Sequence, residues 1–376
     1  MPSVADIVRR FGGGYLEAHG AAVLPSHRRA IADLAACRTA ALGGRLWACD
    51  RCGTTHHVWH SCRSRSCPQC SGDHTRAWLE KRRGEFLPIP YFHVTVTVPH
   101  ELRDWLRRHQ VDGYGALMTA ANDAIVAIAR DPAFVGGTVG VLSVLHTWSQ
   151  RLDHHPHVHC LVTGGGLSDD GSVWHPVVHR DFLAPTRAIA NGVRGRFRAA
   201  IVRRFPDLDI PGEVWRKPWV AHVTVWPAGE DAILEYLARY VFRIAITDRR
   251  ILAVDDRSVT FAYKDRNSGR HKTCRISADE FLRRFLQHVL PKGFHKVRYA
   301  GLWHPSKRRH LLRLRHALLL DRPAVIAADD IAAIAAEPTP PAGAGPVPPI
   351  PVACPHCRTG HLVFRHRLSP IRPRAP

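Results

Sequence analysis

HPHVHCLV, residues 155–162, is the stretch of this sequence that decides its fold. Histidines at alternate positions, followed by an apolar run, predict a β-strand. Side chains at every second position of a strand point to the same face. His155, His157 and His159 therefore share one face of the predicted strand. Three imidazoles on one face predict a site for a divalent metal ion.

His157 and His159 are the two predicted metal ligands, and such a site needs a third. Three residues on the same strand or near it carry suitable donor atoms: His155, Gln150 and His146. His155 has the right strand parity, but Pro156 can twist the strand at that point. The sequence leaves the choice among the three open.

About 80 residues later, the stretch YLARY places Tyr236 and Tyr240 in a predicted helix over residues 231–243. Residues four apart lie one helical turn apart and share a face. A phenol with a pKa of about 10 is a poor nucleophile unless a metal or cationic groups help to deprotonate it. Both tyrosines are candidate nucleophiles for a phosphate ester. The alternative is that one packs in the core while the other reacts.

The pattern of the whole chain predicts an α+β fold with a central, mainly antiparallel sheet. Helices are predicted at residues 1–45, 101–130, 187–204 and 231–243. Strands are predicted at residues 92–98, 141–148, 155–163 and 222–226, with a β-hairpin within 251–276. The triple glycine at residues 164–166 is expected to end the histidine strand, which we expect to lie antiparallel beside residues 141–148.

The charge balance points to a polyanionic partner. The chain has 53 Lys and Arg against 32 Asp and Glu, a formal net charge of +21, and a pI near 10.3. Such an excess suits DNA phosphates, although a ribosome or an anionic membrane surface would also fit. The sequence contains no apolar run of membrane-spanning length and no signal-peptide pattern, which favours a cytoplasmic protein without a membrane partner.

A cysteine-rich block predicts a structural zinc site. Cys49 and Cys52 form one Cys-x-x-Cys pair, Cys67 and Cys70 form another, and fourteen residues separate the two pairs. This spacing is typical of a zinc-ribbon-like module, in which four thiolates close a tetrahedral site. Four residues between the pairs are possible substitute ligands: Cys62, His56, His57 and His60.

A further pair, Cys354 and Cys357, lies near the C-terminus with His361 close by. It is half of a second zinc site or part of an unliganded tail.

The predicted DNA-binding residues are basic. Residues 281–320 contain ten Lys and Arg and no acidic residue, with aromatic side chains between them. Cationic side chains that follow a backbone, together with rings that stack on bases, are typical of single-strand binding. The candidates, including two arginines in the cysteine block, are Arg63, Arg65, Arg283, Arg284, Lys292, Lys296, Arg298, Lys307, Arg308 and Arg309.

Together these motifs resemble the rolling-circle transposases of bacterial insertion sequences, the HUH two-tyrosine type with an N-terminal transposase zinc-binding domain. The resemblance covers residues 42–303. It is carried by CDRCG (49–53), SCRSRSCPQC (61–70), LPIPYFHV (87–94), HPHVH (155–159), YLARY (236–240) and RFLQHVLPKGF (284–294). One departure is Ser66, which stands where the family has a histidine before the cysteine.

The resemblance implies His157 and His159 as ligands of a catalytic Mg²⁺ or Mn²⁺, and the two tyrosines as the nucleophile positions. It implies an HUH-type nuclease core that nicks and joins single-stranded or hairpin DNA at element ends through a 5′-phosphotyrosine. The alternatives are a rolling-circle replication initiator or relaxase, and a non-catalytic zinc-containing DNA-binding protein. Four parts are expected: a helical and zinc-binding domain (1–86), the catalytic domain (87–322), an Ala/Pro-rich linker (323–351) and a basic tail (352–376).

Overall fold

The computed structural model describes residues 2–70, 86–226, 233, 235–241, 243–265, 268–319 and 352–371. The chain divides into two compact units. Unit 1 comprises residues 1–73, 246–289 and 337–376, and unit 2 comprises residues 74–245 and 290–336. The predicted linker at 323–351 lies outside the described residues.

Unit 2 is built on an antiparallel sheet, which confirms the predicted α+β class. Its strands follow the order β11-β4-β5-β3-β7, and the short strand β6 pairs with β5. Their bounds are β3 Tyr91–Thr97, β4 Thr138–Trp148, β5 His154–Leu167, β6 Trp174–Pro176, β7 Val220–Trp226 and β11 Val297–Gly301. The histidine strand is therefore the central strand of the sheet, and β4 is its antiparallel neighbour as expected.

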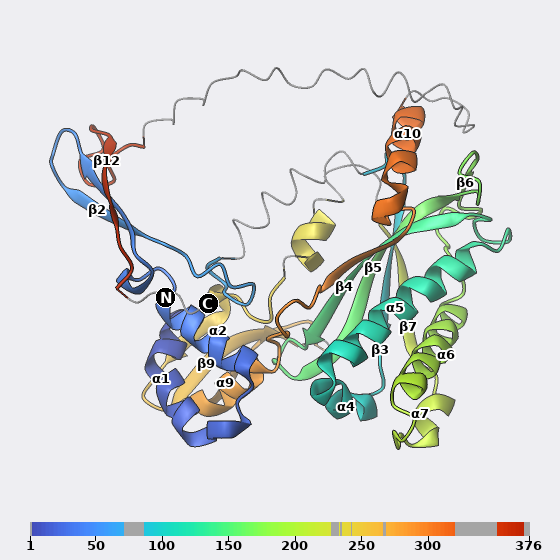
Figure 1. The fold of residues 1–376 in the computed structure, drawn as a ribbon, viewed down its shortest axis with the longest axis horizontal. Coiled ribbons are helices and arrows are strands. Elements are labelled where there is room, and N and C mark those ends of the chain that lie inside the picture. The colour runs from blue at the N-terminus through green and yellow to red at the C-terminus, as the bar shows by residue number, and fades with distance from the viewer. Residues whose placement is uncertain are drawn as a thin grey trace. The chain divides into compact units, whose positions relative to one another are not determined.

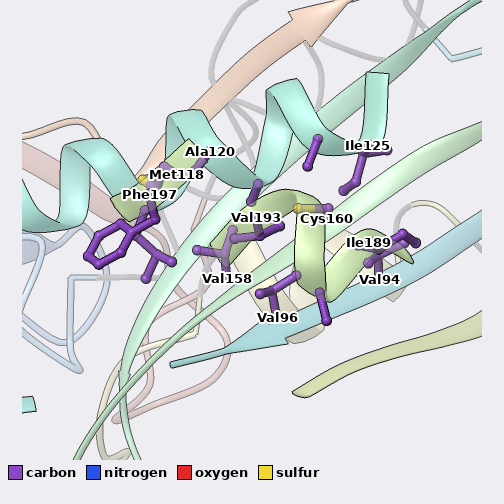
Figure 2. Packing of buried hydrophobic residues seen from close by; sticks show 14 of the residues in the cluster. Val94, Val96, Met118, Ala120, Ile125, Val158, Cys160, Ile189, Val193 and Phe197 are labelled. Carbon is purple, nitrogen blue, oxygen red and sulfur yellow. The ribbon is translucent and has the colours of Figure 1, made fainter. Parts of the chain in front are cut away.

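Two helices, α5 (Gln110–Ala129) and α6 (Thr186–Arg204), pack on one face of this sheet. Figure 2 shows the core between them, where Val158 and Cys160 of β5 meet Met118 of α5 and Val193 and Phe197 of α6. These strand residues alternate with the histidines. The apolar side chains on one face of the sheet therefore pack against α5 and α6. The side chains that alternate with them, including the histidines, point to the opposite face.

A second core covers the opposite face of the sheet. It includes Tyr91 and Leu161 from the strands, and Tyr236, Leu237 and Val241 from the tyrosine segment. The described part of that segment is helical, and Leu237–Val241 forms a π-helix rather than the predicted α-helical continuation. Such turns are rare and occur often at functional sites.

The glycine triplet at 164–166 does not end β5, contrary to the prediction, because the strand continues to Leu167. A Cβ at Gly165 would lie 2.3 Å from the Trp174 ring, and one at Gly166 would lie 2.7 Å from the backbone of Gly137. The glycines therefore serve close packing within the sheet rather than a turn.

Unit 1 combines N-terminal helices with a middle part of the chain. Its elements are α1 (Val4–His19), α2 (Pro25–Ala36), β8 (Ile251–Val254), β9 (Ser258–Lys264), β10 (His271–Ser277) and α9 (Ala278–Leu286). His19 Nε2 lies 2.7 Å from Asp279 Oδ1, and Val4 N donates to Asp248 Oδ1 at 2.9 Å. Residues 246–289, which lie within the range expected for the catalytic domain, pack on the N-terminal helices.

A second sheet of unit 1 has the order β12-β1-β2. Its strands are β1 (Gly44–Cys49), β2 (Thr55–Trp59) and β12 (Leu362–Leu368). Figure 1 shows the red β12 beside the blue N-terminal strands, although more than 300 residues separate them in sequence. The expected basic tail is thus a strand of the N-terminal module.

The remaining helices are α4 (Arg103–Arg108), α7 (Gly212–Arg216) and α10 (Arg308–Leu319), with short helical turns between elements. No helix in the described ranges is long and apolar enough to cross a membrane.

Candidate active site and cysteine clusters

Three neighbouring strands of unit 2 bring the histidines together. His146 of β4 lies directly opposite His157 of β5, and Thr95 of β3 lies opposite His159. One nitrogen from each of His146, His157 and His159 falls within a group whose members are all within 4.8 Å of one another. All three residues are buried. This geometry is that of a three-imidazole metal site.

Hydrogen bonds define which nitrogen of each ring can bind a metal. His157 Nδ1 lies 2.7 Å from the carbonyl oxygen of His155, so Nδ1 carries the proton and Nε2 the lone pair. His159 Nδ1 lies 2.9 Å from His93 Nε2 and 3.1 Å from Thr95 Oγ1, which directs its Nε2 toward a metal. His146 Nε2 donates to the carbonyl oxygen of Tyr240 at 2.7 Å, which leaves Nδ1 as the ligand atom.

The three candidates for the third ligand lie in different places. His146 joins the cluster. His155 has the expected parity, but its Nδ1 lies 2.8 Å from the guanidinium of Arg103, and it is not part of the group. Gln150 lies in the turn after β4. Of the two histidine candidates, His146 is therefore the one that lies with His157 and His159.

Burial keeps two of these imidazoles, those of His146 and His159, in the neutral form that binds metals. Burial lowers the pKa of His146 well below its ordinary value, and repulsion from a protonated His157 lowers it further. Burial likewise lowers the pKa of His159, with neighbouring histidines adding to the effect. At neutral pH both rings offer a lone pair without competition from protons.

The two tyrosines lie beside this site in different environments. The Tyr240 ring is partly exposed, and its centroid lies 4.4 Å from that of His159 and 4.5 Å from that of His93. Tyr236 is fully buried, and its hydroxyl has no hydrogen-bond partner in the described part of the chain. Burial raises the pKa of Tyr236 well above its ordinary value. The environment of Tyr240 therefore suits a nucleophile better.

His93 is a site residue that the sequence analysis did not single out. It lies on β3, and its ring stacks on His159 with a centroid distance of 5.1 Å. The signal was present, because residues 91–97 alternate, and His93 shares a face with the histidine strand once β3 and β5 are paired. Strand pairing, which the sequence does not state, was the missing information.

The predicted zinc site is wrong in its ligand set. The structure divides Cys49, Cys52, Cys67 and Cys70 between two separate clusters instead of one. In the first cluster Cys37 and Cys62 join Cys67 and Cys70. In the second, Cys354 and Cys357 join Cys49 and Cys52. The physical reason is that β12 returns to β1 and supplies a second pair that the spacing within residues 49–70 cannot show.

The first cluster lies at the end of α2. Cys37 Sγ is 3.5 Å from Cys70 Sγ and 3.6 Å from Cys67 Sγ, and Cys62 Sγ is 3.6 Å from Cys70 Sγ. Zn–S bonds of about 2.3 Å in a tetrahedron place sulfurs about 3.8 Å apart. A hydrogen bond from Cys62 lowers the pKa of Cys67 to about 6. The four thiols thus fit a structural zinc ion.

The basic candidates fall in several environments. Arg63 and Arg65 in unit 1 and Lys292 in unit 2 are exposed, and Lys307 is partly exposed. Arg283 and Arg284 form ion pairs with Glu280, at 2.6 Å and 2.7 Å.

Four further candidates have structural contacts or have side chains outside the described residues. Lys296 donates to the carbonyl oxygen of Arg243, and Arg298 to that of Gly115. The side chains of Arg308 and Arg309 lie outside the described residues. The exposed residues are therefore the better candidates for contact with phosphates.

The fold and these sites define a class: a basic α+β protein with a three-histidine metal site beside a tyrosine, and with cysteine clusters. Comparison with known families then places the chain. A model described as "Transposase zinc-binding domain", of the IS91 type, matches residues 7–98. A model described as "Putative transposase" matches residues 140–310, which include the three histidines and both tyrosines.

Curated relatives agree. A protein named "Putative transposase y4qJ", from Sinorhizobium fredii, is 38% identical over 343 residues, 86% of each chain. The transposase for insertion sequence element IS801, from Pseudomonas savastanoi pv. phaseolicola, is 26% identical over 72% of this chain and 68% of its own. The chain belongs to the IS91 family of transposases, a rolling-circle family whose members act on DNA. No solved structure gives a significant match.

Proposed function

We propose that this transposase is a metal-dependent HUH-type endonuclease and strand transferase that cuts single-stranded DNA with Tyr240. One observation carries the proposal. Three buried imidazoles converge within 4.8 Å, and the ring of Tyr240 lies 4.4 Å from that of His159. A nucleophile beside a cation site is the arrangement that phosphoryl transfer requires.

The residues fit a divalent cation. Each of the three imidazoles has one nitrogen engaged with a neighbouring group, which orients the other toward a common point. A cation held by His146, His157 and His159 would supply positive charge to the phosphoryl oxygens. We propose Mg²⁺ or Mn²⁺. Because Mg²⁺ prefers oxygen ligands and imidazole suits softer ions, the donor set favours Mn²⁺ in a direct comparison.

In the proposed reaction, Tyr240 Oη bonds to the scissile phosphorus and the P–O3′ bond breaks. The protein then holds the 5′ phosphate as a phosphotyrosine. The phenolic proton passes to solvent, and the 3′ oxygen leaves as a hydroxyl after taking up a proton. A second 3′ hydroxyl can reverse the step and join the strand to a new partner, which is the strand transfer that transposition needs.

Tyr240 initiates because its surroundings differ from those of Tyr236. Its backbone carbonyl accepts the proton of His146 Nε2, which ties the position of the tyrosine to a metal ligand. Tyr236 is buried in the second core of unit 2 with a raised pKa. Its ring packs 4.8 Å from that of Tyr240, so it supports the nucleophile from within the core. It can act as a second nucleophile only after that core opens.

The proposed substrate is single-stranded or hairpin DNA at element ends. The net charge of +21 supplies affinity for phosphates, and the exposed Lys292 and the partly exposed Lys307 lie in the same unit as the histidines. A tyrosine that must reach a phosphorus also favours a strand that is free to bend into the site.

The test is adduct formation. The protein is incubated with a single-stranded element-end oligonucleotide and Mn²⁺ or Mg²⁺, and covalent protein–DNA product is counted after denaturing electrophoresis. We expect an adduct with wild type and with Tyr236→Phe, and none with Tyr240→Phe. The variant pair is matched, because each loses a single hydroxyl from neighbouring rings.

Two outcomes would contradict the proposal. An adduct that persists in Tyr240→Phe but disappears in Tyr236→Phe would transfer the role to the buried residue. Tight DNA binding without any adduct, unaffected by His157→Ala, would indicate the non-catalytic DNA-binding alternative. A replication initiator or relaxase would form the adduct on origin or transfer DNA but fail to join element ends.

A further inference from the structure

Two cysteine pairs from opposite ends of the chain meet in unit 1. Cys49 Sγ lies 3.6 Å from Cys357 Sγ, and Cys52 Sγ lies 3.8 Å from Cys354 Sγ, a contact between residues 302 positions apart. All four sulfurs fall within 4.8 Å of one another. These separations match the sulfur spacing of about 3.8 Å in a tetrahedral zinc–thiolate site. They are far longer than a disulfide of about 2.05 Å.

We propose that this cluster binds a second zinc ion, which fastens the C-terminal segment to the N-terminal module. The two family models stop at residues 98 and 310, so neither spans the complete ligand set. The inference concerns unit 1 and is independent of the proposed chemistry at Tyr240.

The backbone around the sulfurs is arranged for thiolates. The amides of Arg51 and Cys52 both point to Cys49 Sγ at 3.4 Å, and Gly360 N donates to Cys357 Sγ at 3.3 Å. His56 Nε2 lies 3.7 Å from Cys354 Sγ. Donors aimed at sulfur offset the negative charge of a four-thiolate site, as outer-shell groups commonly do.

Gly360 shows how closely the two pairs are packed. A Cβ at this position would lie 2.5 Å from Cys49 Sγ and 2.7 Å from Asp50 Oδ1. The same turn is held by two reciprocal hydrogen bonds, Asp50 N to the carbonyl oxygen of His361 at 3.0 Å and His361 N to Asp50 Oδ1 at 2.8 Å. Only a glycine allows the two knuckles to approach this closely.

The sheet that carries the cluster needs such a fastening. Among the residues of β1, β2 and β12, only Gly44, Ala48 and Cys49 are buried. Apolar burial of this size contributes little to holding β12, which joins the sheet from more than 300 residues further along the chain. A metal that binds only the assembled pairs supplies the missing stabilisation.

Zinc counting on the full-length protein tests the site. We expect two zinc ions per chain in wild type and one in Cys49→Ser/Cys52→Ser. We expect one in Cys354→Ser/Cys357→Ser, and still one when all four changes are combined. If both cysteine pairs bind the same ion, the loss of either pair removes that ion, and the loss of both pairs removes no more. The control Cys274→Ser, a cysteine outside both clusters, should keep two. Two ions in Cys354→Ser/Cys357→Ser, or none in the combined variant, would overturn the proposal.

A second experiment guards against simple misfolding. A protease recognition sequence is inserted between residues 330 and 340, and the protein is cut. The C-terminal fragment should co-elute with the rest of the chain until a zinc chelator is added. Gly360→Ala, which keeps every cysteine, should release the fragment and hold one zinc. Gly13→Ala, where a Cβ meets no atom within 4 Å, should keep the fragment bound and hold two zinc ions. Retention of the fragment after chelation would refute the metal fastening.

Discussion

The two units of this transposase reach metal-binding geometry by opposite routes. In unit 2, residues 156–167 of β5 are all buried, and a packed core on each face orients the histidines before any metal arrives. In unit 1, only three residues of the sheet β12-β1-β2 are buried, and the cysteines of the second cluster come from both ends of the chain. On the two proposals above, the fold of unit 2 builds a metal site, whereas in unit 1 the metal builds part of the fold.

This difference separates two uses of a metal. A cation in a preformed site adds little to folding and can be devoted to chemistry at a substrate. A cation whose ligands are brought together only by folding contributes its binding free energy to stability. The same protein therefore responds in two ways to the loss of its metals, and each way is measurable.

The largest expected effect follows from zinc removal. Structural zinc binding contributes about 10–16 kcal/mol in zinc-finger peptides, far more than the buried area of β12-β1-β2 can supply. Stripping zinc with a strong chelator should abolish hydrogen-exchange protection in β1, β2 and β12. Protection in β4 and β5 should remain near its original value, because that sheet has its own core.

The same measurement contains its control. The part of unit 1 formed by α1 and α9, whose buried residues include Ile7 and Phe281, contains no cysteine of either cluster and should keep its protection. Unchanged exchange in β1 after complete zinc removal would show that the sheet folds without metal. The comparison between the units would then fail.

How far the sequence alone could lead also differs between the units. Within unit 2, the alternation at residues 155–162 and the spacing of Tyr236 and Tyr240 are local patterns, and the strand, its neighbour and two of three histidines followed from them. His146 could be proposed but not selected, because selection required the register between β4 and β5. His93 was missed for the same reason.

In unit 1 the informative contacts are not local. The spacing of Cys49 to Cys70 predicted one complete zinc site, and nothing within that stretch shows that Cys354 and Cys357 return to it. Cys37 follows a helix without any paired cysteine nearby. The sequence signal was the spacing of Cys354 and Cys357, which is that of half a zinc site, and only the structure shows which pair completes it.

The next largest effect contrasts the two faces of β5. His157→Ala should lower the rate of adduct formation by about 100-fold or more, because it removes one ligand of the proposed cation. The charge of that cation would stabilise the transition state. The substitution should leave thermal stability nearly unchanged. Val158→Ala, one residue away on the core face, should cost about 2 kcal/mol of unfolding free energy and spare the chemistry.

Activity assays at saturating metal, together with thermal unfolding of both variants, test whether the two faces of β5 have separate roles. Equal loss of activity in Val158→Ala, measured well below its unfolding temperature, would mean that the two faces are not separate in function. The claim that one face is structural and the other chemical would then be lost.

A smaller effect is expected at His93, which we assign a positioning role through His159. His93 Nε2 lies 2.9 Å from His159 Nδ1 and helps to direct the opposite nitrogen toward the metal. His93→Ala should weaken Mn²⁺ affinity about 10-fold to 100-fold, as losses of outer-shell partners do. At saturating Mn²⁺, the rate of adduct formation should recover to within roughly a few-fold of the wild-type rate. A rate that high Mn²⁺ cannot rescue would place His93 in the chemistry itself.

The smallest effect concerns charge in the part of unit 1 that has no zinc. Hydrogen bonds from Arg283 and then Arg284 lower the pKa of Glu280 to about 2, against an ordinary value of 4.5. Because the folded-state pKa is the lower one, the stabilisation is complete above pH 4.5 and is lost as the pH falls toward 2. The ion pairs of Glu280 with Arg283 and Arg284 are partly exposed, so their contribution to the unfolding free energy should be only about 0.5–1 kcal/mol.

Glu280→Gln should therefore lower the unfolding free energy by that amount at pH 7 and by nothing near pH 2. It should also release two arginines and tighten DNA binding slightly at low salt. An equal stability loss at both pH values would show that Glu280 acts by packing rather than by its charge.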